Sequence, residues 1–254
     1  MKYIKTFDTE SDYNAGKSEL SFPYVAYTKD DEQVHYARGI EDIADVIGTV
    51  TPGTSSFSFK LNTSTTVNAT IIGNKFYYVL PSDMTITKVS QCFANNQNIL
   101  SLEKFNIPVP LDSDNQSFFY NCRSLTSATL ENRNNLTYIG ANFAYGCVAL
   151  QEVVIPDTVT IIAESAFNGC TSLTSVVLPA SLSKVGKRFF LNCSNLANVT
   201  CLASTPPTQH GSSMGLMFDG CSENLVIYVP SASVAAYQAA SGWSTYASRI
   251  QAIP

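Results

Sequence analysis

The sequence predicts a mainly β solenoid, in which one short strand from each coil stacks on the next to form a parallel sheet. Two observations support this fold. Cysteines recur at steps of 25, 23, 23 and 28 residues, at positions Cys122, Cys147, Cys170, Cys193 and Cys221. A short alternating strand follows the cysteines, as in "LTSVVLP" after Cys170. A fixed period with one strand per repeat indicates coils that bury their inner faces only by stacking on neighbours.

Each coil repeats one template around its cysteine. A leucine lies three residues after it, at Leu125, Leu150, Leu173 and Leu196. A phenylalanine lies three residues before it, at Phe119, Phe167, Phe190 and Phe218, whereas Phe143 is shifted by one. An earlier coil fits if Asn96 takes the place of the cysteine, since Phe93 and Ile99 then hold the flanking positions. We therefore expect a right-handed solenoid of about five or six coils.

The strand of each coil has an inner and an outer face. Within "LTSVVLP" the two-residue alternation directs Leu173, Val176 and Leu178 inward, and Ser175 and Val177 outward. The stretch that closes the coil, "PASLSKVGKRFF", is too short and too broken by proline, glycine and serine for a full helix. It predicts extended or turn segments with at most a few helical residues.

The seven cysteines are interpreted as structural thiols. An odd number in a chain of 254 residues argues against a disulfide scaffold, and no CxxC pair offers zinc-ligand spacing. Equivalent residues of stacked coils lie roughly 4.8 Å apart, and parallel side chains keep their Cβ atoms beyond the roughly 3.5 to 4.5 Å that a disulfide needs. We expect buried, reduced and inert thiols whose S–H groups point at backbone carbonyls in the turn.

Composition excludes some partners. A formal net charge of -5 and a pI near 5.0 argue against nucleic-acid binding, because no Lys/Arg cluster is available to neutralise phosphates. No apolar run approaches the roughly 20 residues needed to span a bilayer. The N-terminal "MKYIKTFDTESDY" is polar where a signal peptide has its apolar core, so no export signal is visible. Location therefore stays open between the cytoplasm and export with a leader removed.

The repeat itself resembles a known family. The stretch "AESAFNGCTSLTSVVLPASLSKVG" is similar to the BspA-like leucine-rich-repeat family, whose repeats follow the pattern AFxxCxxLxxVxLPxxLxxIG. The C-terminal "VIYVPSASVAAYQAASGWSTYASRI" is similar to the terminal segment of many such proteins. The family is common in surface proteins of Bacteroidetes. The resemblance implies a leucine-rich-repeat stack, a cell-surface or secreted location and, for some members, adhesion to host matrix proteins or other bacteria. It brings no catalytic residue.

Three regions are predicted: a β-rich N-terminal region at 1–86, the solenoid at 87–230 and a C-terminal capping helix at 231–254. In the first, "YVAYTKDDEQVHY" predicts two strands around a turn, and "ATIIGNKFYYVLP" predicts a hairpin with Gly73 and Asn74 at its tip. Between them "GIEDIADVIGTV" predicts a short helix. The opening residues also resemble a segment of other Bacteroidetes proteins, some of them phage-related.

The C-terminal region is expected to close the open, apolar end of the stack. Either Ser231 or Ser233 is expected to cap its helix. Its apolar contacts are assigned to Val234, Tyr237, Trp243, Tyr246 and Ile250. Trp243, the single tryptophan, is interpreted as a packing residue, with a sugar-stacking platform as the alternative.

Three short motifs suggest chemistry but are interpreted as loops. "GSSMG" centres on Ser213 with His210 nearby, yet it lies in a Pro/Ser/Gly loop and not between the strand and the helix of a hydrolase nucleophile elbow. "GTVTPGTS" from Gly48 lacks the lysine of a phosphate loop and predicts a turn. "DSDNQSFFYNCR" from Asp112 lacks the central glycine and final glutamate of a calcium loop. We expect neither a metal site nor a cofactor.

The candidate binding site is the outward face of the strands. In consecutive coils it consists of Ser127, Thr129, Glu152, Val154, Ser175, Val177, Asn198 and Thr200. The preferred function is non-catalytic binding or adhesion, with a protein of the host matrix or a bacterial surface, or a glycan, as partner. A merely solvated face is an equal alternative, and the loop from Ser204 to Leu216 is an alternative site. Other functions considered are a structural part of a phage or surface assembly, and a serine hydrolase using Ser213 and His210.

Overall fold

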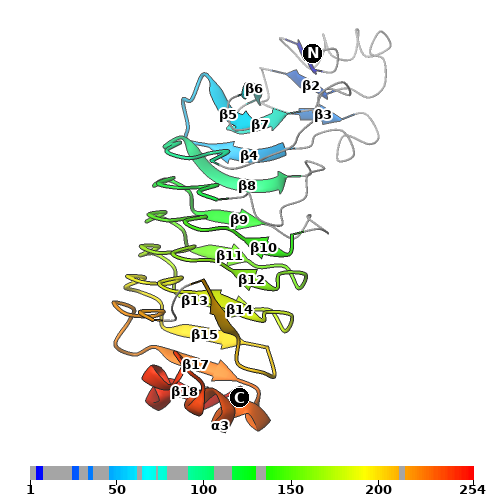
Figure 1. Ribbon diagram of the computed structural model, residues 1–254. Helices are drawn as coiled ribbons and strands as arrows, with labels where there is room; N and C mark the ends of the chain where they lie inside the picture. Colours follow the sequence, from blue (N-terminus) through cyan, green and yellow to red (C-terminus); the bar gives the residue numbers. More distant parts are fainter. Residues whose placement is uncertain are drawn as a thin grey trace.

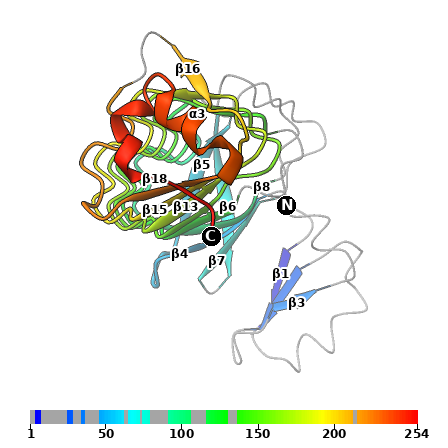
Figure 2. The same ribbon diagram turned by 90° about the horizontal axis from the view of Figure 1, so that it is seen from below.

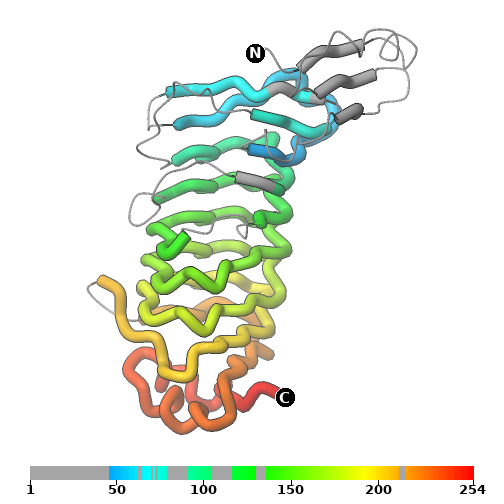
Figure 3. The backbone as a smooth tube through the Cα atoms, turned by 90° about the vertical axis from the view of Figure 1, so that its right-hand side faces the viewer, coloured from blue at the N-terminus to red at the C-terminus, as the bar shows by residue number. Residues whose placement is uncertain are grey.

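The computed structural model describes residues 4–7, 25–28, 34–36, 46–61, 65–72, 74–78, 91–105, 116–129, 136–211 and 215–254. It confirms a solenoid with parallel strands (Figure 1). Within these ranges six coils repeat the same turn geometry along the stack, which Figure 3 shows edge-on as a ladder of successive coils. The predicted coil number is therefore confirmed.

Two parallel ladders run along the stack. One contains a longer strand from each coil: β8 (Ile99–Phe105), β9 (Ser127–Thr129), β11 (Glu152–Val154), β13 (Ser175–Leu178), β15 (Asn198–Cys201) and β17 (Val226–Val229). The other contains β10 (Tyr138–Ile139), β12 (Ile161–Ile162), β14 (Lys184–Gly186) and β16 (Thr208–His210). Paired strands come from successive coils in both ladders. Within the described residues four of the six coils contribute a strand to the second ladder, and the first ladder consists of two sheets, because β11 and β13 are not paired.

The core lies between these ladders and the turns. Leu173, Val176 and Leu178 are at most 4% exposed, as the alternation of the strand predicts. Phenylalanine rings stack along the axis, for example Phe167 on Phe190 with centroids 5.2 Å apart. Because each ring packs against those of the coils above and below, the core is one continuous column.

Two left-handed residues shape the turn of every coil. The second of them directly precedes the cysteine position and is asparagine or glycine in all six described turns: Asn95, Asn121, Gly146, Gly169, Asn192 and Gly220. These two residue types tolerate positive φ best. The turn therefore explains why the sequence reads Asn-Cys or Gly-Cys.

The cysteines close this turn through their thiols. Each Sγ donates to a backbone carbonyl of the preceding coil, as Cys122 does to Phe93 at 2.9 Å and Cys147 to Phe119 at 3.0 Å. Cys170, Cys193 and Cys221 repeat the contact at 3.1–3.2 Å. All seven thiols are free, and six are buried. The predicted contact between thiols and turn carbonyls is thus confirmed for these five cysteines, although Cys221 is only half-buried. Cys201 differs, because its Sγ lies 3.2 Å from the hydroxyl of Tyr237.

The N-terminal end of the core is covered by antiparallel strands (Figure 1). These are β4 (Val46–Val50), β5 (Phe57–Leu61), β6 (Thr65–Ile72) and β7 (Lys75–Tyr78). β4 pairs with both β7 and β8 and so joins this cover to the solenoid sheet. The predicted short helix is thus wrong over 46–50, where the chain is a strand with alternating burial.

Aromatic rings seal this end. Phe57 stacks on Phe76 with centroids 4.2 Å apart, and Phe59 packs on Phe93 at 5.0 Å. The predicted hairpin around Asn74 is confirmed by the antiparallel pair β6 and β7. β2 (Val25–Thr28) and β3 (Val34–Tyr36) also pair antiparallel, as predicted, and β1 (Ile4–Phe7) pairs with β2.

The C-terminal end is closed by short helical segments and not by one helix (Figure 2). These are η2 (Ser231–Ser233), α3 (Val234–Ala239) and η3 (Ser244–Arg249), followed by strand β18 (Ile250–Ala252) against β17. The predicted serine cap is wrong, because neither helix start has a side-chain cap and Ser233 Oγ donates to the carbonyl of Ser204 at 2.7 Å.

Trp243 packs in this cap. Its side chain is fully buried, its Nε1 donates to the carbonyl of Pro207 at 2.9 Å, and its ring meets Tyr237 edge-on. The packing interpretation is confirmed and the sugar platform is wrong, because no face of the ring reaches solvent. Val234 is half-buried, while Tyr246 and Ile250 are buried with Tyr237, as predicted.

Candidate binding face

The outward face of the longer strands places the predicted residues in register. Ser127 lies opposite Glu152 and Thr129 opposite Val154 across β9 and β11, and Ser175 and Val177 lie opposite Asn198 and Thr200 across β13 and β15. All eight are half-buried or exposed, whereas the residues between them are buried. That this face binds a partner stays a prediction.

The face is not the continuous lattice that the repeat predicts. β9 and β11 form one pair and β13 and β15 another, but β11 and β13 belong to different sheets. Gln151 N donates to Thr126 O and Ala197 N donates to Thr174 O, yet the equivalent bond from Thr174 to Gln151 is absent. The hydrogen-bond ladder is therefore interrupted between these two coils.

A proline removes one further bond between these coils but is not the cause of the interruption, since Pro156 and Pro230 hold the equivalent places in coils whose strands β11 and β17 stay paired with β9 and β15. In the next coil, Leu202 N donates to the carbonyl of Leu178 at 3.0 Å. Pro179 occupies the place of Leu202 one coil earlier, and proline has no N–H to donate to Ile155. On the turn side the same coils remain joined, because the Cys170 thiol still donates to Ala144 O. The opening is thus local to the strand face.

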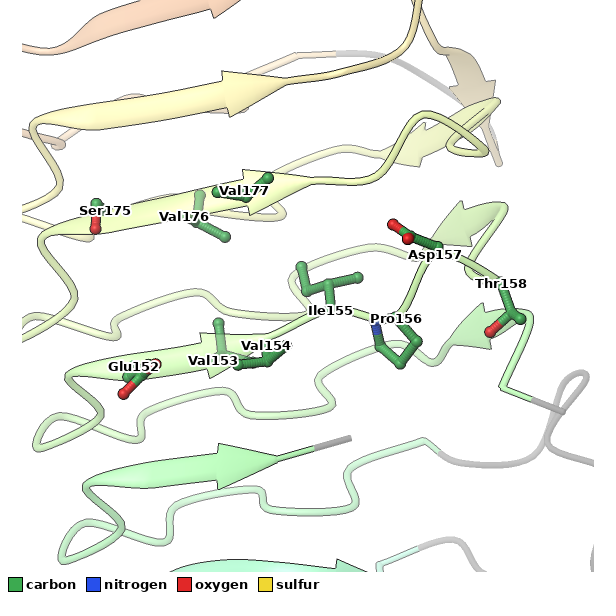
Figure 4. Close-up of a pocket in the computed structure, with 10 residues that line it drawn as sticks. All are labelled: Glu152, Val153, Val154, Ile155, Pro156, Asp157, Thr158, Ser175, Val176 and Val177. Atoms are coloured by element: carbon green, nitrogen blue, oxygen red, sulfur yellow. The ribbon is translucent and has the colours of Figure 1, made fainter. Parts of the chain in front are cut away.

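A groove of about 500 Å³ lies at this opening. It is lined by residues 152–158 of one coil and 175–177 of the next. Figure 4 shows Glu152 at one end and Asp157 towards the other, with Val154 and Val177 between them. Val177 is 54% exposed, more than any other large hydrophobic side chain in the described part of the protein.

The face also extends further than predicted. Val226 lies opposite Asn198, and Tyr228 lies opposite Thr200 and, on its other side, Gln251 of β18. Tyr228 is half-buried, and its hydroxyl has no hydrogen-bond partner among the described residues. The alternation in "VIYVP" carries this signal, since Ile227 and Val229 point inward. The face therefore does contain one of the aromatic types that anchor interfaces.

Burial makes the thiols of two turn cysteines poor nucleophiles. Burial raises the pKa of Cys122 to about 12 and also raises the pKa of Cys147. A thiolate is the reactive form, so these groups stay protonated at neutral pH. The predicted inertness agrees with this direction of the pKa.

The alternative hydrolase site is described only in part. Ser213 lies outside the described residues, while His210 Nε2 lies 3.4 Å from the hydroxyl of Tyr138. A strand, β16, precedes Gly211 where a loop was predicted, but no helix follows in the described residues 215–221. Of the strand and helix that flank a nucleophile elbow, the described residues contain only the strand. They contain no catalytic triad.

The other motifs carry no site. "GTVTPGTS" begins in β4 and ends in a turn closed by Thr54 N donating to Thr51 O, as predicted. Asp112 and Asp114 of the stretch "DSDNQSFFYNCR" lie outside the described residues, and residues 116–123 of it form the turn of a coil. Where the structure describes the chain, no group of three or more metal-ligating side chains occurs, and no helix has the length and apolarity to cross a membrane.

Comparison with protein families identifies the same repeat. A family model for the BspA-type leucine-rich-repeat region matches six copies over residues 87–222. The chain is similar to a solved leucine-rich-repeat protein of Treponema pallidum, with 24% identity and a TM-score of 0.44 over 57% of this chain and 72% of that one. For a leucine-rich-repeat protein of Bacteroides ovatus the identity is 25% and the TM-score 0.45, over 69% of this chain and 41% of that one. For a leucine-rich cell-surface protein of Faecalibacterium prausnitzii they are 18% and 0.31, over 72% and 71%. No curated protein matches.

Proposed function

Because the chain belongs to the BspA-type leucine-rich-repeat family, we propose that it is a non-catalytic protein-binding or adhesion module that uses the outward face of its longer strands. One observation carries the choice of face. Val177 and Tyr228 stand exposed or half-exposed in the same row, with the small residue Thr200 between them in register. An exposed apolar side chain and, two strands away, an aromatic residue whose hydroxyl has no partner among the described residues are the kind of side chains that anchor interfaces.

The rest of the row favours weak or repeated contacts. Serine, threonine and asparagine side chains surround the two anchors, and these contribute little to tight interfaces. Affinity at such a face rises through multivalency when many copies meet a repetitive surface. A matrix protein or a bacterial surface protein at a cell-surface or secreted location fits this behaviour. A glycan and a structural role in a phage or surface assembly remain alternatives.

The test is binding of the whole chain to a panel of purified matrix proteins and to intact bacterial cells, measured by biolayer interferometry and by sedimentation. The face variants are Tyr228→Ala and the pair Val154→Glu with Val177→Glu. Val148→Glu is the matched control, since Val148 is 37% exposed but lies in the turn after Cys147. We expect at least a tenfold loss in the face variants and none in the control.

Unchanged binding in the face variants, with circular dichroism intact, moves the site to the segment from Ser204 to Leu216. A separate experiment tests the proposal that the protein is not a serine hydrolase. A fluorophosphonate probe labels activated serines, so we expect no labelling of Ser213. Labelling that disappears in His210→Ala supports the hydrolase instead.

A further inference from the structure

We propose that the groove between β11 and β13 binds an extended basic peptide segment of a protein partner, with two Lys or Arg side chains four residues apart and an apolar residue midway between them. This inference rests on the proposed function, because the groove opens on the same face. It adds the chemistry of the partner.

The first argument is charge. Glu152 and Asp157 line the two ends of the groove, and both are exposed. Neither has an ion-pair partner among the described residues, and no Lys or Arg lines the groove. The nearby cations Lys184 and Lys187 lie on or just after β14 in the other ladder, where Lys187 pairs with Glu164 at 3.3 Å. The groove is therefore acidic, with both carboxylates available.

The second argument is the interrupted ladder. Without the bond from Thr174, the carbonyl of Gln151 has no partner among the described residues. It precedes Glu152 directly, so an acceptor without a donor adjoins a carboxylate at one end of the groove. A guanidinium or ammonium group satisfies both at once, because it carries several N–H donors and no acceptor. An anionic or purely apolar ligand leaves this end unsatisfied.

The third argument is length. Glu152 and Asp157 are five positions apart in the sequence, so their Cα atoms lie at most about 18 Å apart even if the chain between them is fully extended. Residues i and i+4 of an extended peptide share one side and lie about 13 Å apart, a gap that flexible basic side chains bridge. Residue i+2 then faces Val154 and Val177, which lie between the acidic ends in Figure 4. Its apolar side chain covers the exposed Val177.

The experiment titrates the whole chain with a fluorescent peptide, Gly-Arg-Thr-Val-Thr-Arg-Gly, blocked at both termini, and follows anisotropy. Comparison peptides replace both arginines by glutamate, or place the arginines side by side. The test variant is Glu152→Gln with Asp157→Asn. The matched control is Glu164→Gln with Glu223→Gln, which removes the same charge from positions outside the groove.

We expect the spaced basic peptide to bind, and its affinity to fall about fivefold or more in the groove variant, since each exposed ion pair contributes a few-fold. The charge-matched control stays within about twofold, and 0.5 M salt weakens binding. The adjacent-arginine peptide binds less tightly and the acidic peptide does not bind. Equal losses in the two double variants, or no binding of the spaced peptide, overturn the proposal.

The two proposals fail in different ways. Suppose that a protein partner no longer binds the Val154→Glu, Val177→Glu variant but binds the groove variant as tightly as the parent chain. The proposed binding face is then supported, and the basic-peptide site is contradicted. The opposite outcome is peptide binding that weakens in the groove variant, together with a protein partner whose affinity is the same in all face variants. That result supports the basic-peptide site and contradicts the proposed binding face.

Discussion

The side-chain amide of Asn96 donates to the backbone carbonyl of Ser58 at 3.2 Å, and in the first coil it takes the role that a cysteine thiol has in each later coil. Ser58 belongs to β5, so this contact fastens the antiparallel cover to the repeat. The substitution of asparagine for cysteine at this position therefore marks the point where the preceding neighbour is no longer another coil.

Replacing Asn96 by alanine is expected to lower the free energy of unfolding by about 0.5–1.5 kcal/mol, because Ser58 loses its donor. Asn96→Cys restores a donor and is expected to recover part of the loss. Urea denaturation measures both. Asn224→Ala serves as control and stays within about 0.5 kcal/mol, because Asn224 is exposed and its side chain makes no hydrogen bond within the described part of the chain. If Asn96→Ala does not change the free energy of unfolding, the hydrogen bond from Asn96 to Ser58 does not stabilise the protein.

Three glycine variants separate backbone strain from collision. Among the described residues, Gly215 has neither positive φ nor a neighbour near the position that a Cβ would take, and Gly211 has φ +89° with none near it either. Gly146 has φ +71°, and Asn121 Oδ1 lies where its Cβ would be. We expect Gly215→Ala to be neutral, Gly211→Ala to cost about 1–2 kcal/mol and Gly146→Ala to cost more. Thermal melts rank them. Equal effects at Gly146 and Gly211 would mean that Asn121 moves aside freely.

The buried thiols predict a loss of stability in alkali. Cys122 has a folded pKa of about 12, above its ordinary value of 9.0, because burial disfavours the thiolate. The stability linked to the neutral thiol is fully present below pH 9 and is lost as the pH rises from 9 towards 12. Cys122→Ser removes this group, so its stability between pH 9 and 11 is expected to fall less steeply, by up to about 1.4 kcal/mol per pH unit. Identical slopes in parent and variant would contradict the raised pKa.

Trp243 provides a spectroscopic signal for the C-terminal cap. Its buried ring predicts blue-shifted emission and little quenching by iodide in the native chain. Trp243→Phe removes the hydrogen bond to Pro207 and part of the ring, at an expected cost of about 1–3 kcal/mol. Guanidinium unfolding followed by circular dichroism measures the cost. Sugars at millimolar concentration are expected to leave the emission unchanged, and a shift would restore the sugar platform.

Much of the coil could be predicted from sequence because its physics is local and repeated. The period places each cysteine next to the same carbonyl, and alternation alone separates Val176 from Val177. The conformation of β4 could not be predicted in this way. The spacing of its aliphatic residues suits a helix, and only pairing with β7 and β8 makes it a strand. These partners lie elsewhere in the sequence, so the local pattern gives no sign of them.

The binding face was predicted less completely for two reasons. Leu225 lies four residues after Cys221, whereas the equivalent leucines of the other coils lie three residues after their cysteines. The repeat pattern therefore did not align Tyr228 with the outward-facing residues of the earlier strands. The interruption between β11 and β13 left no signal, since both coils fit the same pattern. Pro179 gives no such signal either, because Pro156 and Pro230 stand at the equivalent place in coils whose strands β11 and β17 remain paired with β9 and β15.

The thiol contacts described above each join residues 26 to 31 positions apart in the sequence. Each contact therefore closes a loop of similar length, between a cysteine and a carbonyl of the coil that precedes it. Folding can therefore begin at any adjacent pair of coils and spread in both directions, at a rate set by short loops and not by the length of the stack. Adding or deleting a whole coil alters no other closure, so lineages can vary the number of coils while the geometry of each is preserved.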